Sequence, residues 1–169
     1  MSLARLGQFG ISKVAAGGGG GPTAYRYYRL NITANNGDIN YIGSNTFALR
    51  ESVGGADAVQ GSGGLGTVKT FLGETYNAAK LFDNSNGTGW ISVNPVAFPE
   101  WAQWDFGTGN EKVIVEYAVG AYPTSNATNG RSPNAWTFQG SNDLSAWTDL
   151  DSQTGQTGWT LAELRVFTL

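Results

Sequence analysis

The sequence predicts an all-β fold, an antiparallel β-sandwich whose two sheets face each other across an aromatic core. Twenty-five glycines and six tryptophans in 169 residues are typical of a domain with many turns and large core side chains. Apolar and polar residues alternate in several short segments, and no long segment has helical spacing. The chain is long enough to bury a core without disulfides, and it contains no cysteine.

The clearest strand pair is predicted over residues 135–150. Trp136 and Phe138 are two residues apart, so both side chains lie on the same face of a strand. Residues 140–143 (Gly-Ser-Asn-Asp) favour a turn, and apolar character returns at Trp147 and Leu150. This pattern predicts an antiparallel pair that packs through its two tryptophans.

The first 21 residues are predicted to form an extended arm separate from the domain of residues 22–169. The arm ends in five consecutive glycines, which have high conformational entropy and no side chain to pack. We expect its spaced apolar residues to dock on a neighbouring subunit; these are Leu3, Leu6, Phe9 and Ile11. The alternative is an arm that folds back on its own domain.

Residues 22–53 are predicted to form an N-terminal hairpin. Tyr28, Leu30 and Ile32 alternate with polar residues, as in a half-buried strand. Residues 35–38 (Asn-Asn-Gly-Asp) favour a tight turn, and residues 39–50 can supply the returning strand.

Residues 54–73 are rich in glycine and are predicted to form a long loop, followed by a third segment, residues 74–169. Within that segment, residues 75–82 have the spacing of a single helical turn. Residues 113–119 form the clearest interior strand, because one face carries only Val113, Val115, Tyr117 and Val119.

Composition excludes several classes of function. A net charge of −3 with no basic stripe argues against a nucleic-acid partner, and no apolar run is long enough to span a membrane or resembles a signal peptide. We therefore expect synthesis in a cytoplasm. Histidine is absent, and neither Asp149 with Asp151 nor Glu100 with Asp105 forms a convincing catalytic pair, so we expect no enzymatic activity.

Three motifs in the third segment resemble those of a known family. They are residues 79–92 (AKLFDNSNGTGWIS), residues 100–107 (EWAQWDFG) and residues 136–150 (WTFQGSNDLSAWTDL). In this order they resemble the discoidin family, also called the coagulation-factor type C domain, of the galactose-binding-like superfamily. The match spans residues 78–169, and it implies a jelly-roll sandwich.

The same resemblance implies a circular permutation. Segments similar to residues 25–32 usually form the closing strands at the C-terminus of the family's domain, whereas here they come first. The N-terminal hairpin would then fill the place of those C-terminal strands. The alternative is strand exchange, in which residues 25–32 complete the sheet of another copy.

The resemblance also implies a possible calcium ion at the loop of residues 83–90, where many family members bind one. Asp83, Asn86 and Thr88 would supply oxygen ligands. A second acidic ligand would come from the closing strand, but Glu51 cannot be aligned to it. The alternative is an Asx-type turn without a metal, and we expect no other cofactor.

Sugar binding requires exposed aromatic rings beside hydrogen-bonding side chains. The main candidates are Trp90, Tyr122, Asn129 and Arg131, together with Phe98 and Trp101. Against this, Trp90, Trp101 and Trp104 match framework positions of the family, which are usually core. Sugar-binding members also commonly use a histidine, which this chain lacks.

The amino-acid sequences of residues 25–37 and 154–160 resemble those of bacteriophage-encoded versions of the family. This resemblance implies a non-catalytic virion structural protein, either a capsid decoration or a tail or fibre component, anchored by its N-terminal arm. Its partners would be other virion proteins and copies of itself, and its location the virion. The alternative is a carbohydrate-binding adhesin module that contacts a glycan on the host cell surface.

Overall fold

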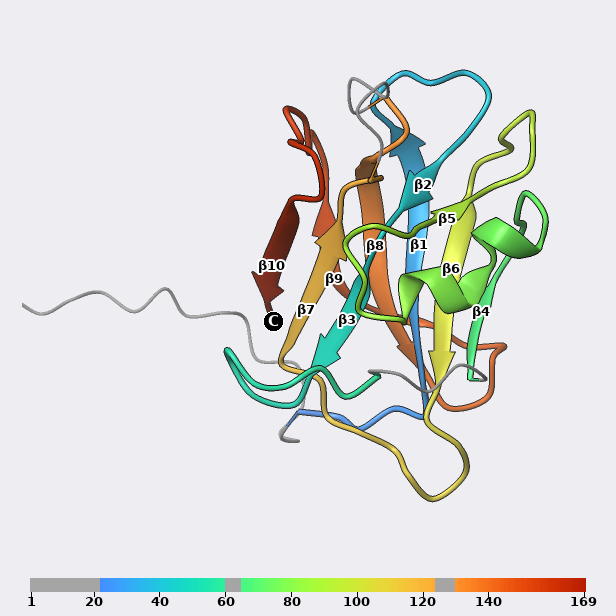
Figure 1. Ribbon diagram of the computed structural model, residues 1–169. Helices are drawn as coiled ribbons and strands as arrows, with labels where there is room; N and C mark the ends of the chain where they lie inside the picture. Colours follow the sequence, from blue (N-terminus) through green and yellow to red (C-terminus); the bar gives the residue numbers. More distant parts are fainter. Residues whose placement is uncertain (1–21, 60–64, 124–129) are drawn as a thin grey trace, which may run out of the picture.

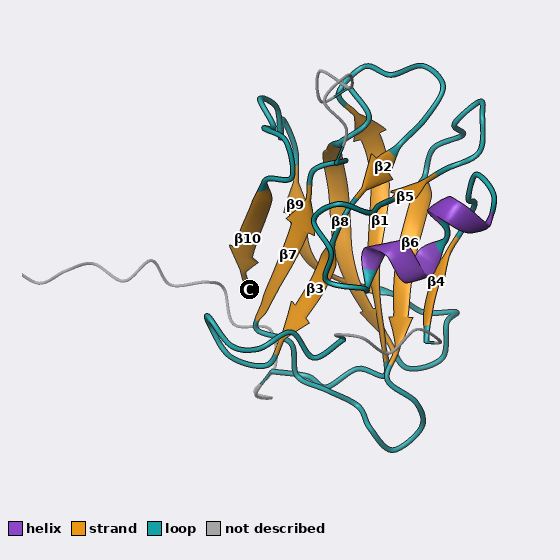
Figure 2. Cartoon of the chain, viewed as in Figure 1, coloured by secondary structure: helices purple, strands orange, loops and turns teal. Residues whose placement is uncertain are grey.

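The computed structural model describes residues 22–59, 65–123 and 130–169, so the predicted arm, with Leu3, Leu6, Phe9 and Ile11, lies outside the described residues. The described chain forms two facing layers of antiparallel strands (Figure 1). Its strands are β1 (Tyr27–Asn35), β2 (Gly43–Ser44), β3 (Phe47–Arg50), β4 (Gly66–Val68), β5 (Trp90–Ile91), β6 (Glu100–Asp105), β7 (Glu116–Gly120), β8 (Pro133–Ser141), β9 (Thr148–Gln153) and β10 (Leu164–Thr168). Two short 3-10 helices, η1 (Glu74–Tyr76) and η2 (Ala78–Leu81), lie beside β4 and β6 (Figure 2).

The larger sheet has five strands in the order β4-β6-β1-β8-β9. β1 lies at its centre, with Leu30 opposite Ala102 of β6 and Phe138 of β8. Tyr28, Leu30 and Ile32 face the core and are almost fully buried, which confirms the predicted alternation of this strand.

The hairpin predicted for residues 22–53 is wrong. β1 pairs with β6 and β8, whereas β3 pairs with β7 in the other sheet. The turn that follows β1 explains the difference. The backbone N–H groups of Asn36 and Asp38 both donate to the Gly130 carbonyl oxygen, at 2.9 and 3.2 Å. The chain is thereby held against the segment before β8 and crosses to the opposite sheet instead of returning along β1.

The smaller sheet has the strand order β10-β7-β3. β2 and β5 form a separate two-stranded antiparallel pair. Every residue of β7 is buried, which confirms an interior strand, although the strand begins at Glu116 and not at residue 113. Glu116 is the first residue of β7. Its carboxylate accepts a hydrogen bond from the Arg50 guanidinium at 2.5 Å and further hydrogen bonds from the Gly54 N–H. This ion pair lowers the pKa of Glu116, with some opposition from burial.

The core between the sheets is aromatic. The Phe138 ring of β8 stacks on Tyr117 of β7 with 4.2 Å between centroids, and on Tyr28 of β1 with 5.6 Å. Phe47 of β3 meets the same ring edge-on at 6.2 Å. Because these rings come from both sheets, they establish the predicted all-β sandwich.

A buried hydrogen-bond chain also crosses the core. Trp136 Nε1 donates to the Tyr117 hydroxyl at 3.0 Å, and that hydroxyl donates to Asp151 at 2.7 Å. Burial, together with the bond to Asp151, raises the pKa of Tyr117, so its hydroxyl stays protonated and keeps donating at physiological pH.

The remaining predicted elements have mixed outcomes. β8 and β9 form the predicted antiparallel pair, with an irregularity between Phe138 and Gln139. Trp136 is buried, whereas Trp147 lies under the Arg29 guanidinium, whose carbon is 3.9 Å from the ring centroid. The helical turn predicted at residues 75–82 corresponds to η1 and η2. The loop predicted for residues 54–73 is not wholly a loop, because it contains β4, which pairs with β6 at the sheet edge.

Candidate functional site

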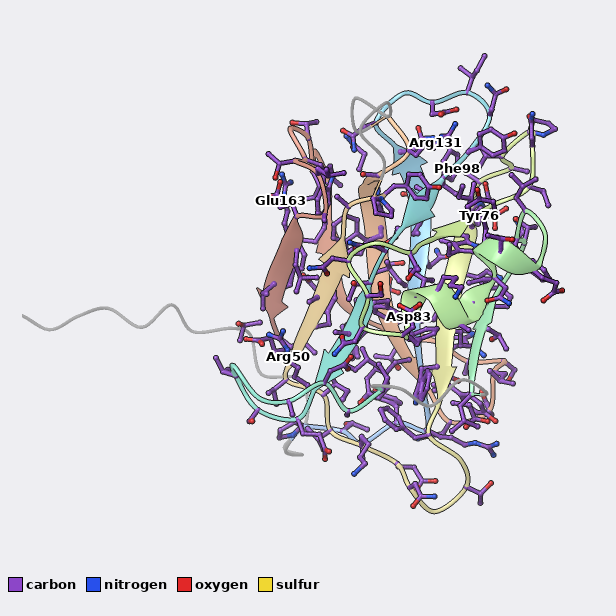
Figure 3. All side chains as sticks on the ribbon, viewed as in Figure 1. Arg50, Tyr76, Asp83, Phe98, Arg131 and Glu163 are labelled. Carbon is purple, nitrogen blue, oxygen red and sulfur yellow. The ribbon has the colours of Figure 1, made fainter. Side chains whose placement is uncertain are left out.

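The loops at one end of the sandwich meet around Arg131 (Figure 3). Arg131 Nε donates to Asp38 Oδ2 at 2.9 Å. The guanidinium carbon lies 4.7 Å from the ring centroid of Tyr41 and 5.6 Å from that of Tyr122. Arg131 therefore ties the loop after β1 to the segment before β8 through an ion pair and two cation–π contacts.

The electrostatics of this cluster favour a fixed ion pair. Partial burial disfavours the charged form of Asp38, but Arg131 and the N–H groups of Asn40 and Tyr41 outweigh it and lower the pKa of Asp38. Burial raises the pKa of Tyr122, whose backbone N–H also donates to Ser132 at 3.0 Å. The cluster thus acts as a structural joint, in which the side chains of Arg131 and Asp38 remain 29% and 20% exposed.

Two of the predicted sugar-contacting aromatic residues cannot stack on a ligand here. The Trp90 side chain is fully buried, and its indole N–H donates to the Thr70 carbonyl oxygen at 2.6 Å. Tyr122 is 4% exposed and packs under Arg131. These positions are corrected to core, while Asn129 lies outside the described residues. Phe98 is exposed and Trp101 half-buried.

The loop predicted as a calcium site contains an Asx-type turn. Asp83 Oδ1 accepts the Ser85 N–H at 3.0 Å, and Oδ2 accepts the Thr88 hydroxyl at 2.7 Å. Lys80 Nζ lies 3.8 Å from Oδ2. Asn86 is exposed, and Glu51 pairs with Lys112 elsewhere. Within the described ranges, no three His, Cys, Asp or Glu side chains gather where they could hold a metal ion, and calcium binding by Asp83, Asn86 and Thr88 stays a prediction.

Most of the carboxylates considered as catalytic pairs serve separate framework contacts. Asp105 accepts two hydrogen bonds from Arg26, at 2.7 and 2.8 Å. Asp149 accepts a hydrogen bond from the Gln139 amide at 2.6 Å, and Asp151 accepts one from the Tyr117 hydroxyl.

In the described part of the chain, no helix is long and apolar enough to cross a membrane.

Glu100 differs from these carboxylates because it is fully buried and forms no ion pair with a described residue. It has no exposed surface, and neither carboxyl oxygen is in hydrogen-bonding geometry with a described residue. Burial raises the pKa of Glu100, although Thr70 and Lys69 nearby oppose the shift. Since the folded state holds this proton more tightly than the unfolded state, Glu100 destabilises the protein increasingly as the pH rises.

We therefore predict that Glu100→Gln changes the pH dependence of stability. In the wild type, the contribution of Glu100 to the free energy of unfolding should fall as the pH rises. The fall begins near the ordinary glutamate pKa of about 4.3, which applies to the unfolded state, and ends at the raised pKa of the folded state. Urea unfolding of both proteins from pH 3 to pH 8 should show the variant gaining stability relative to the wild type across that window. A constant difference between the two proteins would contradict a raised pKa.

Sequence reasoning missed an exposed apolar surface on β10. Leu164 and Val166 point outward and are 43% and 47% exposed, with Leu161 and Leu169 exposed beyond the strand ends. Phe167, on the other face, packs on Tyr117 with 5.1 Å between centroids. The signal was present in the sequence: residues 163–169 (ELRVFTL) have apolar residues on both faces of a strand.

Comparison of this chain with protein-family models, with curated proteins and with solved structures finds no match.

Proposed function

We propose that this protein is a non-catalytic structural component of a bacteriophage particle, a capsid decoration or a tail or fibre component. It would assemble with copies of itself and with other virion proteins. The observation that carries the proposal is the exposed apolar surface of β10, an edge strand that pairs, among the described residues, with β7 alone. An edge strand with unpaired backbone groups and apolar side chains is a template for another chain.

β9 and β10 are both edge strands, but they differ in how well they are protected from pairing with another chain. β9 ends the larger sheet and carries Asp149 and Asp151, next to an irregularity in its pairing with β8. Charges and bulges of this kind normally prevent edge-to-edge association. β10 has neither lysine nor proline, and its one charged residue, Arg165, is bound by Glu163 at 2.7 Å. This contrast favours β10 as an interface.

A second copy is the occupant that suits β10 best. In an antiparallel pair related by a twofold axis at Val166, Val166 lies opposite its own counterpart and Leu164 opposite Thr168. The exposed apolar residues of the two strands then form one continuous row. The predicted arm, through Leu3, Leu6, Phe9 and Ile11, would supply a second attachment to the particle.

We also infer that the sandwich is a circularly permuted jelly roll of the galactose-binding-like type. The position of β1 between β6 and β8 of its own chain supports permutation over strand exchange. The bacteriophage origin rests on the resemblance of residues 25–37 and 154–160 to phage-encoded domains. In the adhesin alternative, Trp90 and Tyr122 are too buried to stack on a sugar. Sugar binding would then depend on Arg131 and the neighbouring loop.

Sedimentation of the purified full chain tests the β10 interface. We predict that the wild type sediments above the monomer mass of 17.9 kDa and that Val166→Lys weakens self-association at least about tenfold, because two like charges would face each other across the twofold axis. The matched control is Ile39→Lys, at a loop residue that is 83% exposed and distant in sequence from β10, which should associate like the wild type.

Two results would contradict the interface. One is a wild type that remains monomeric at all concentrations in the presence of its arm. The other is equal association of Val166→Lys and the wild type, which would place the contact elsewhere.

A further inference from the structure

Three asparagine residues in this chain are followed directly by glycine: Asn36, Asn86 and Asn129. An asparagine before a glycine can lose ammonia without an enzyme, because the glycine has no Cβ to hinder the approach of its backbone nitrogen to the asparagine side chain. Asn36 and Asn86 lie in the described part of the chain, whereas Asn129 lies outside it. These two described residues differ in how firmly their side chains are held.

The Asn36 side chain is fixed by hydrogen bonds on both of its polar atoms. Its Nδ2 donates at 2.9, 3.3 and 3.1 Å to three carbonyl oxygens, those of Ser132, Pro133 and Gln156. Its Oδ1 accepts a hydrogen bond from Asn134 at 3.2 Å. The N–H of Gly37 also donates, to the side chain of Asn35 at 3.0 Å. Reaction at Asn36 would first have to break these bonds.

Asn86 lies in the loop between η2 and β5, and both Asn86 and Gly87 are exposed. The Asn86 side chain forms no hydrogen bond with another described residue, and the N–H of Gly87 donates only a long bond, of 3.3 Å, to Ser85 Oγ. Apart from its two chain neighbours, a Cβ added to Gly87 would meet only that Oγ, at 3.9 Å. The Asn86 side chain and the Gly87 nitrogen are therefore free to approach each other.

We propose that Asn86 is a site of spontaneous deamidation, with water as the co-reactant. The backbone nitrogen of Gly87 loses its proton and attacks Cγ of Asn86. The bond from Cγ to Nδ2 breaks, and the side-chain nitrogen takes up a proton and leaves as ammonia. Water then opens the five-membered succinimide ring at either of its carbonyl carbons, which leaves aspartate or isoaspartate at position 86. No group is oxidised or reduced.

The reaction changes both the charge and the backbone of this loop. One neutral amide becomes a carboxylate, so the formal net charge of −3 becomes −4. Isoaspartate also routes the main chain through the side-chain carbon, which lengthens it by one atom. The loop contains the hydrogen bond from Thr88 to Asp83, so its conformation responds to that change. The inference does not depend on the proposed function or on assembly through β10.

Peptide mapping by mass spectrometry of the full chain, incubated at neutral pH, tests the site against two internal controls. Asn36 also precedes a glycine but has a fixed side chain, whereas Asn84 is exposed in the same loop but precedes Ser85. We expect Asn86 to convert at least about tenfold faster than either control in the folded protein. In guanidinium chloride, Asn36 should convert as fast as Asn86, because only the fold protects it.

Gly87→Ala provides a second test. It should slow the conversion of Asn86 at least about tenfold, because a Cβ hinders attack by the backbone nitrogen. It should not lower the urea midpoint of unfolding, since the added methyl group has space.

A folded protein in which Asn86 converts no faster than Asn36 or Asn84 would overturn the proposal. An Asn86 that stays intact in the folded protein but converts in the unfolded chain would also overturn it, because the fold would then protect both sites. Conversion at the wild-type rate in Gly87→Ala would contradict attack by the Gly87 nitrogen.

Discussion

Phe138→Ala should lower the free energy of unfolding by about 3–5 kcal/mol, the usual cost of removing a buried phenylalanine. Phe138 has no exposed surface and contacts Tyr28, Phe47 and Tyr117, so its ring joins the two sheets. A cavity at this point would remove packing from both layers at once. Urea denaturation followed by tryptophan fluorescence measures the effect.

The matched control is Phe98→Ala. Phe98 is 38% exposed and lies in the loop before β6, so its removal should cost clearly less than that of Phe138. If the two variants lose similar stability, the aromatic stack does not hold the sheets together and the description of the core is wrong.

Trp90→Ala should be comparably damaging, at about 3–5 kcal/mol. The Trp90 ring on β5 is fully buried. Its indole N–H donates to the carbonyl oxygen of Thr70, which lies in the segment that leads to η1. Trp90→Phe should be milder, since it keeps much of the apolar bulk and loses mainly that hydrogen bond, at about 1–2 kcal/mol. Thermal or urea unfolding of both variants gives the comparison.

This series also separates the two roles considered for Trp90. A residue that stacks on a ligand could be removed with little loss of stability, whereas a core residue could not. A stable Trp90→Ala variant would therefore restore Trp90 as a binding residue and contradict its burial.

Local sequence patterns predicted which segments become strands better than they predicted which strands pair. The alternation at Tyr28, Leu30 and Ile32 depends only on neighbouring residues, and it is correct. The partners of β1 are residues 100–105 and 133–141, far away in the chain, and no local signal identifies them. The turn at residues 35–38 favoured a hairpin, but its backbone bonds go to Gly130. β4 was missed because three residues, Gly-Thr-Val, are too few to show a period.

The candidate sites depended even more on tertiary structure. Trp90 and Tyr122 lie in or next to segments that look like loops, and the sequence alone does not show that both rings turn inward. Asp83 followed by polar residues suits both a calcium loop and an Asx turn; the structure contains the bonds of the turn to Ser85 and Thr88, and calcium binding there stays a prediction.

The incorporation of full-length variants into particles tests the central claim, that this protein is a structural component which assembles through β10. We predict that the wild type and Ile39→Lys copurify with particles in equal amounts, whereas Val166→Lys folds normally but is depleted from them, because a charge replaces the centre of the exposed apolar row. Undiminished incorporation of Val166→Lys, or absence of the wild type from particles, would contradict it.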